Sequence, residues 1–157
     1  MAYQPKNYRK FVATAATATL VASAIAPVAS AADFKDVSSK YKEAVDFVVS
    51  KGASGTTATT FGTDANIKRG DAAVLLVKVL GLDTAKAPDA GFEDVNSRLA
   101  PYINALKEAG ITAGKTETTF DPDAQITRGE LAVWIYKGFG LEGESELEFK
   151  DVNKNYQ

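Results

Sequence analysis

The sequence contains neither cysteine nor histidine, and these two absences exclude several kinds of protein. Without cysteine, an exported chain of this size has no disulfide bonds and must be stabilised by a packed core. Without cysteine and histidine, zinc sites of the usual kind and Ser-His-Asp catalysis are also excluded. We therefore expect no metal site and no cofactor.

Acidic residues are present, but they form no recognisable site. Asp121, Asp123 and Gln125 are spaced like the start of a calcium-binding loop. Ile126, however, stands where the turn glycine is required, and Glu130 comes two positions too early to be the bidentate ligand. Paired carboxylates for glycoside hydrolysis are possible with 20 acids, yet nothing singles out a pair. We expect a protein that is not an enzyme.

The N-terminus has the pattern of a secretory signal peptide. Lys6, Arg9 and Lys10 precede an apolar run over residues 11–26, and the small residues at 29–31 fit a cleavage site. A transmembrane helix is the alternative, but a run of about 16 residues is short for a bilayer. We predict a cleaved signal peptide and a secreted product that has no membrane partner after cleavage.

The predicted secreted part is mildly acidic. Positions 1–31 carry three of the 18 basic residues and no acidic one, which leaves a formal charge of 15 − 20 = −5. DNA and anionic lipids attract basic surfaces. We therefore expect neither nucleic acid nor a membrane to be the main partner.

Two motifs recur along the chain at nearly constant spacing. Phe-x-Asp-Val occupies positions 34–37, 92–95 and 149–152. Ile-x-Arg-Gly followed by an acid occupies positions 67–71 and returns at 126–130. Self-similarity at a fixed period predicts repeated structural units that must pack on one another.

The motif positions divide the chain into four predicted segments. They are a signal peptide (residues 1–31), a first repeat (residues 32–90), a second repeat (residues 91–147) and the truncated start of a third (residues 148–157). We interpret this truncation as a sign that the chain is a fragment of a longer protein.

Each repeat is predicted to fold as helix, loop and helix, which gives an all-α class with long loops. In the first repeat, Ser38 or Ser39 can cap a helix that ends near Lys51. Its buried face is predicted to contain Tyr41, Ala44, Val45 and Val48. A second helix over about residues 69–80 ends before Gly81 and is apolar over most of its circumference, which predicts a central position.

The second repeat carries the same signals with stronger caps. Pro101 suits the start of its first helix, and Gly110 suits the end. Thr127 and Glu130 have the spacing of a capping box at the start of the later helix. The equivalent cap position in the first repeat is Lys68, which cannot accept a hydrogen bond. We expect that helix start to be weaker by roughly 0.5–2 kcal/mol.

The repeat resembles the S-layer homology domain, most closely in its second copy. The similar motifs there are Ala100-Pro101-Tyr102-Ile103, Gly110-Ile111-Thr112-Ala113-Gly114, Thr119-Phe120-Asp121-Pro122 and Ile126-Thr127-Arg128-Gly129-Glu130, after the Phe-x-Asp-Val opening. The resemblance implies repeats that occur in threes and form a pseudo-threefold spindle around a central helical bundle. It also implies binding of Gram-positive secondary cell-wall polysaccharides, frequently pyruvylated, in grooves between repeats.

The resemblance further implies that an arginine of the Thr-Arg motif is central to glycan binding, which points to Arg128 and, less directly, to Arg69. Arginine offers a planar pair of donors that matches the carboxylate of a pyruvate ketal, and the first turn of a helix favours anions. The alternative is that both arginines are structural and pair with acids such as Asp36 or Asp94. The first repeat departs from the family pattern at Lys68, Asp71, Phe61-Gly62-Thr63 and a one-residue deletion between Gly52 and Phe61.

Other recurring residues have two possible roles. Asp36, Asp94 and Asp151 can each cap a helix or turn the chain, or else contact a ligand in a groove, where Gly114 is a further candidate. Trp134, with Tyr136 and Phe139 nearby, can be a platform for sugars or part of the core, and we predict that Trp134 is packed.

The favoured hypothesis is a secreted, non-catalytic module that anchors an S-layer protein in the cell wall by binding pyruvylated secondary cell-wall polysaccharide. Self-assembly into an S-layer would then involve C-terminal regions of the parent protein. The first alternative is the wall anchor of a secreted enzyme, such as a glycanase, with its catalytic domain C-terminal to this chain. The second is a purely structural repeat that serves oligomerisation without glycan contact.

Overall fold

The protein is described by a computed structural model over residues 34–143 and 150–152. The predicted signal peptide and Phe149 lie outside these described residues. Four helices follow one another along the described chain, α1 (Ser39–Ser50), α2 (Arg69–Leu80), α3 (Ala100–Glu108) and α4 (Arg128–Gly138). Over the described ranges there is no β-strand, and the only β-pairing is an isolated bridge between Lys68 and Gln125. The predicted all-α class is confirmed.

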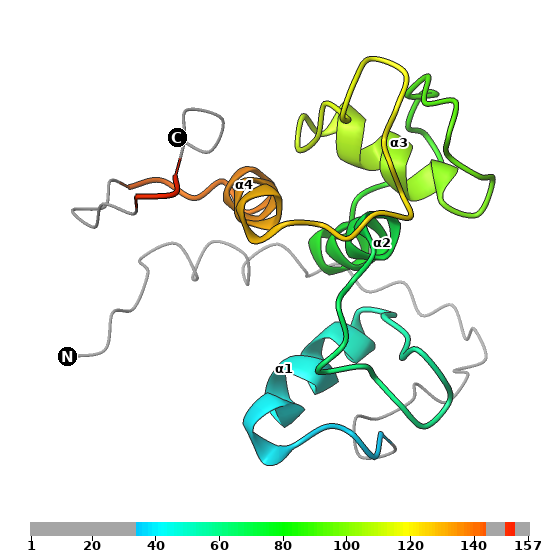
Figure 1. Ribbon diagram of the computed structural model, residues 1–157. Helices are drawn as coiled ribbons and strands as arrows, with labels where there is room; N and C mark the ends of the chain where they lie inside the picture. Colours follow the sequence, from blue (N-terminus) through cyan, green and yellow to red (C-terminus); the bar gives the residue numbers. More distant parts are fainter. Residues whose placement is uncertain (1–33, 144–149, 153–157) are drawn as a thin grey trace, which may run out of the picture.

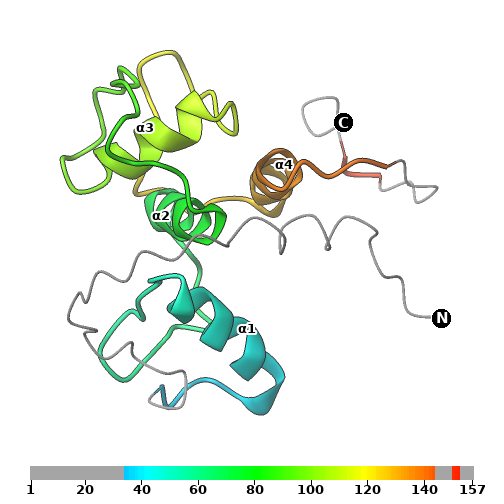
Figure 2. The ribbon, with the colours of Figure 1, turned by 180° about the vertical axis from the view of Figure 1, so that it is seen from behind.

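The helices form two lobes with α2 between them (Figure 1). One lobe contains α1 and the loop that follows it, and the other contains α3 and its loop. Both views show α2 and α4 end-on beside each other in the middle of the molecule, while α1 and α3 lie across the view (Figure 2). The expected central position of the first repeat's later helix is therefore confirmed.

Packing crosses the boundary between the two sequence repeats. Helix α2 of the first repeat packs on α3 and α4 of the second. The main core is built from one face of α2, from α3, from one residue of α4 and from the second repeat's loops. It contains Ala72, Ala73, Leu76, Val77, Phe92, Leu99, Ile103, Ala105, Leu106, Ile111, Phe120 and Trp134. One repeat thus supplies part of the core of the next, as expected for units that cannot cover their own apolar faces.

The α1 lobe has a small core of its own. Phe34, Val45 and Val49 are buried there, with Val37 and Phe61 packed against them. The two phenylalanine rings meet edge to face, 5.6 Å apart. The second repeat has the equivalent contact in the pair Phe92 and Phe120, also at 5.6 Å.

The predicted buried face of α1 is partly wrong. Tyr41 and Ala44 are exposed, whereas Val45 and Val49 are buried. Because α1 packs on its own loop rather than in the central bundle, only a narrow stripe of the helix is covered. Ser38 is the N-cap residue as predicted, but within the described part of the chain its side chain makes no capping hydrogen bond.

The later helices agree closely with the sequence. Helix α2 has the predicted bounds, and Gly81 closes it in the left-handed conformation. The capping box of Thr127 and Glu130 is present at the start of α4. None of the described helices combines the length and apolar character that a membrane span requires.

The one-residue deletion in the first repeat lies between Gly52 and Gly55. An added methyl group at Gly55 would collide with the ring of Phe34, and one at Gly114 would collide with the ring of Phe92. The two glycines are therefore structural equivalents, and each precedes its phenylalanine, at 61 or 120, by the same interval. The loops have the same length beyond these glycines.

Replacing Gly114 should be costly. Gly114 has φ +88° and its missing side chain makes room for the Phe92 ring, so Gly114→Ala should lower the free energy of unfolding by about 2–4 kcal/mol. Gly110→Ala is the control: it also has a positive φ, but among the described residues an added methyl group meets no atom within 4 Å. That variant should lose only about 1 kcal/mol in urea denaturation. Equal losses for the two variants would contradict the role of close packing.

Candidate functional site: the junction between the repeats

The start of α2 is inserted into the loop of the second repeat. The backbone N–H of Arg69 donates to the carbonyl of Ala124 at 2.8 Å, and that of Gly70 donates to Pro122 at 2.9 Å. The first amides of a helix have no partner inside the helix, so these carbonyls replace a side-chain cap. The expected weakness at Lys68 is thus compensated by hydrogen bonds from the neighbouring repeat.

Gly70 allows this close approach. A methyl group at this position would meet Leu99 at 2.8 Å and the carbonyl oxygen of Pro122 at 3.1 Å. Any larger residue would push the loop of the second repeat away from the helix start. The glycine of the Arg-Gly motif is therefore a packing requirement of the junction.

The side chain of Arg69 enters an aromatic cage in the second repeat. Its guanidinium carbon lies 4.8 Å from the ring centre of Phe120 and 4.7 Å from that of Trp134. The two rings are themselves stacked, with centres 5.9 Å apart. Arg69 is only 3% exposed, and Trp134 is buried beside it as predicted. Such contacts between a desolvated cation and aromatic faces are favourable.

The charge of Arg69 is paired within this cage. Its Nη1 lies 3.1 Å from Oε1 of Glu130, and its Nη2 donates weakly to the hydroxyl of Thr112 at 3.5 Å. Nε and Nη1 of Arg69 have no hydrogen-bond partner among the described residues. The contact of Nη1 with Glu130 is an ion pair whose alignment is too poor for a hydrogen bond. Burial lowers the pKa of Arg69, and Glu130 and Asp121 oppose this effect. The guanidinium still remains charged at neutral pH.

Glu130 connects three parts of the junction. Its carboxylate accepts from the backbone N–H of Thr127 at 3.0 Å, lies beside Arg69 and accepts from the ammonium of Lys115. Burial alone would raise the pKa of Glu130. The hydrogen bonds from Lys115 and Thr127 and the charge of Arg69 outweigh burial and lower the pKa to about 2.

Arg128 has a different environment from its sequence equivalent. It is the first residue of α4, directly after the capping residue Thr127, and it is exposed. Arg69 and Arg128 occupy the same position of the motif, but the structure buries only Arg69 of these two. Of the two predicted ligands, Arg128 is the one whose side chain can meet a large polymer from solvent.

The recurring aspartates fasten loops. Asp36 accepts from the backbone N–H groups of Phe61 (2.8 Å), Gly62 (2.6 Å) and Thr63 (3.2 Å). These N–H groups, that of Phe61 above all, lower the pKa of Asp36 against the opposing effect of burial. Asp94 accepts likewise from Phe120 at 2.8 Å and Asp121 at 2.6 Å. Asp151 lies in an exposed turn.

Asp36 and Asp94 therefore bind the end of the loop that joins the two helices of their own repeat, and they do not cap the helix that follows them. A carboxylate that accepts several backbone N–H groups is well suited to this task.

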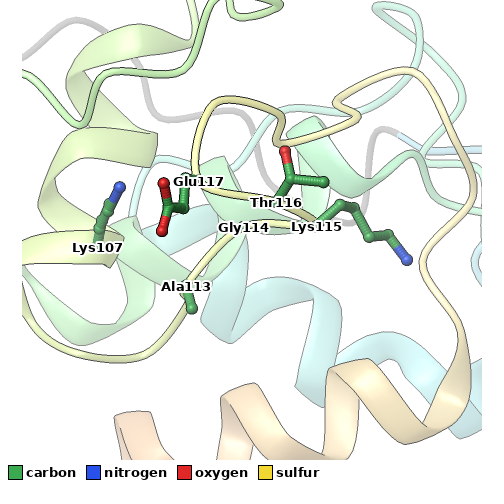
Figure 3. A pocket seen from close by; sticks show the side chains of 6 residues that line it. All are labelled: Lys107, Ala113, Gly114, Lys115, Thr116 and Glu117. Carbon is green, nitrogen blue, oxygen red and sulfur yellow. The ribbon is translucent and has the colours of Figure 1, made fainter.

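Gly114 lies at a surface hollow of about 570 Å³, shown in Figure 3. The hollow is lined by Lys107 from α3 and by the loop residues 113–117. No group of three or more acidic residues in the described ranges is arranged to hold a metal ion. Thr112 and Lys115 are not predicted as site residues from the sequence, because neither belongs to a motif that returns in the first repeat. The same deletion that shortens that loop obscures the equivalence.

Residues 33–73 and 91–132 match the family described as the S-layer homology domain. The chain is 42% identical over 160 residues to the surface-layer 125 kDa protein of Lysinibacillus sphaericus, which covers 98% of this chain and 13% of that protein. It is 31% identical over 155 residues to the S-layer protein EA1 of Bacillus anthracis, which covers 93% and 18%.

A third relative is named as an enzyme, an endoglucanase. The chain is 31% identical over 150 residues to an endoglucanase of Bacillus sp. (strain KSM-635), which covers 88% of this chain and 16% of that protein. This chain therefore spans between 13% and 18% of the length of these three relatives.

The buried position of Arg69 predicts a large effect of its removal. Arg69→Ala should lower the free energy of unfolding by about 3–5 kcal/mol, because it leaves Glu130 without its buried partner and empties the aromatic cage. Arg98→Ala is the control, since Arg98 is 69% exposed and lies 3.7 Å from its partner Asp71. Urea denaturation should show a loss of at most about 1 kcal/mol there. Similar losses would mean that the junction is not held by Arg69.

The low pKa of Glu130 predicts a pH-dependent contribution to stability. A depressed carboxyl pKa stabilises the folded state above the ordinary value of 4.5, and the contribution disappears as pH falls through about 2. Glu130→Gln should therefore cost up to about 3 kcal/mol at pH 7 and much less at pH 2. The measurement is chemical denaturation of both proteins from pH 7 to pH 2, with the exposed Glu43→Gln as control. A difference that does not change with pH would refute the ion-pair role.

Proposed function

Because the chain belongs to the S-layer homology domain family, we propose that it anchors an S-layer protein to the cell wall by binding secondary cell-wall polysaccharide. The observation that carries this proposal is the family match across both repeats, together with a junction that holds the first Arg-Gly motif in a fixed position. The module itself is non-catalytic. The proposed location is outside the cell, in the wall and its S-layer, after removal of residues 1–31.

The proposed ligand is the carboxylate of a pyruvylated glycan, and Arg128 is its proposed binding residue. Arg128 is exposed at the start of α4, where a planar guanidinium can make two parallel hydrogen bonds to a carboxylate. Arg69 is proposed to support the groove from inside, through its contacts with Trp134 and Glu130. Asp36 and Asp94 keep the loops of the groove in shape.

A further repeat is proposed to cover α4, which gives the pseudo-threefold arrangement. When the motif arginines are aligned, the buried α2 residues Ala72, Ala73, Leu76 and Val77 correspond to Leu131, Ala132, Ile135 and Tyr136 on α4. Ile135 and Tyr136 are exposed here, although α2 buries its equivalent residues under α3. This apolar face fits a unit that begins with the third Phe-x-Asp-Val motif. Regions of the parent protein beyond this module are proposed to assemble the S-layer.

The endoglucanase among the relatives supports a second candidate. In that case the same module anchors a secreted enzyme instead of a lattice protein. Both candidates give this chain the same glycan-binding role and differ in the cargo that is anchored. The sequence of the parent protein beyond the module distinguishes them: extended β-rich domains support a lattice protein, and a compact catalytic domain supports an enzyme.

Arg128 provides the test of the proposed mechanism. Arg128→Ala should weaken binding to purified pyruvylated wall polysaccharide by about 10- to 100-fold, the effect of losing a charge-assisted hydrogen bond. Arg98→Ala changes the net charge equally and should leave binding within about twofold, apart from general screening effects. Calorimetry or surface plasmon resonance gives both values.

The same measurement on polysaccharide stripped of pyruvate completes this test. Weak binding of the stripped polymer by the unaltered protein supports the carboxylate mechanism. Equal binding of the two polymers would refute it.

A further inference from the structure

We propose that the α1 lobe, defined as residues 34–63, opens as a separate unit while the rest of the fold stays intact, and that Lys78 is the latch that holds it closed. Such an opening is a property of the fold and does not depend on which ligand the protein binds.

The apolar core of the α1 lobe is separate from the main core. Phe34, Val45 and Val49 are buried in it with Val37 and Phe61 against them, and over the described residues the main core includes none of these five. Among the described helices, α2 packs on α3 and on α4, whereas α1 takes part in neither of these contacts. Both views place the α1 lobe and the α3 lobe on opposite sides of α2 (Figures 1 and 2). A region with a small core of its own can open by itself.

The face of α1 that is equivalent to the α2-facing side of the second repeat is uncovered. Aligned on the Phe-x-Asp-Val motif, Tyr41 and Phe47 correspond to Leu99 and Ala105. Leu99 faces α2, since an added methyl group at Gly70 would meet it at 2.8 Å. Leu99 and Ala105 are each only 4% exposed, whereas Tyr41 is 39% and Phe47 50% exposed. Apolar packing thus fixes the second repeat to α2, and in the described part of the chain α1 lacks this contact.

The lobe is joined to α2 by three exposed residues. Thr63 is fastened to the lobe, since its backbone N–H donates to the carboxylate of Asp36 and its hydroxyl to the backbone carbonyl of Asp36. Ile67 is fastened to the second repeat, because its carbonyl accepts from the backbone N–H of Ile126 at 3.3 Å. Residues 64–66 lie between these two points and are all exposed. This short segment separates the part that opens from the part that stays folded.

Lys78 links the lobe to the main core. Its ammonium, in the last turn of α2, donates to the carbonyl of Gly52 just after the end of α1. The same ammonium lies 6.0 Å from the ring centre of Tyr102 on α3, so it is held from both sides. A hydrogen bond from a charged donor is stronger than a neutral one. The equivalent residue of α4 is Lys137, which is exposed.

Opening entails unfolding of α1. A unit well below about 40 residues without disulfides rarely folds alone, so a lobe that loses its contact with α2 loses its helix as well. The junction around Arg69 and the exposed Arg128 stay in place in the open form, because both lie beyond residues 64–66. The part of the chain to which glycan binding is assigned therefore does not depend on the closed lobe.

Native-state hydrogen exchange of the whole chain at increasing urea tests this opening. The backbone amides of α1 should exchange at least about tenfold faster than those of α2 and α3. Their rates should also depend less on urea, since opening of the lobe exposes less surface than global unfolding. Lys78→Met should speed exchange in α1 about tenfold, the effect of losing one charge-assisted hydrogen bond. Lys137→Met is the matched control and should change the α1 rates by less than about twofold.

Ile103→Val distinguishes separate opening from global unfolding. Ile103 is fully buried in the main core, so the lost methyl group should speed exchange in α2 and α3 about two- to tenfold. The α1 rates should stay within about twofold, because the main core is intact in both the closed and the open form. Circular dichroism of each variant accompanies the exchange data.

Two results would overturn this assignment. If α1 exchanges as slowly as α2 and α3, or if Ile103→Val speeds α1 by the same factor as α3, the fold is one cooperative unit and separate opening is refuted. If Lys78→Met exchanges like Lys137→Met, the latch is refuted.

Discussion

The structure depends on the insertion of one helix start into the neighbouring repeat. Two backbone N–H groups of α2 bond to carbonyls at 122 and 124, and the Arg69 side chain lies between Phe120 and Trp134. These contacts fix α2 against the second repeat, so that its apolar face forms the main core together with α3. The lobe of α1, in contrast, relies on three buried residues of its own. The larger core therefore forms across the boundary between the two repeats and not within a single repeat.

Glu130 is the point at which structure and proposed function meet. One carboxylate completes the cap of α4, balances the buried Arg69 and holds Lys115 at the rim of the hollow. A pKa lowered to about 2 keeps it charged at neutral and mildly acidic pH. These contacts hold the start of α4, Arg69 and Lys115 in fixed positions relative to one another.

The sequence predicts the helices of this protein better than it predicts their surroundings. The capping box, the bounds of α2 and the buried Trp134 follow from local signals, and the structure confirms them. The predicted burial of Tyr41 is wrong, because helical periodicity does not reveal how much of a helix its neighbours cover. The contrast between Arg69 and Arg128 also cannot be read from the sequence, since the two residues lie in equivalent motifs and differ only in the units packed around them.

The junction has a direction. Its donor is the Arg-Gly start of a later helix, and its acceptor is the loop and glutamate of the following repeat, so the contact is heterologous and not two-fold symmetric. In the described part of the chain, the first repeat supplies the helix start and the second repeat supplies the loop and the glutamate that receive it. Because the two repeats contribute different surfaces to this junction, their order along the chain is part of the fold. Units joined this way cannot be exchanged or inverted freely, because each would meet its neighbour with the wrong surface.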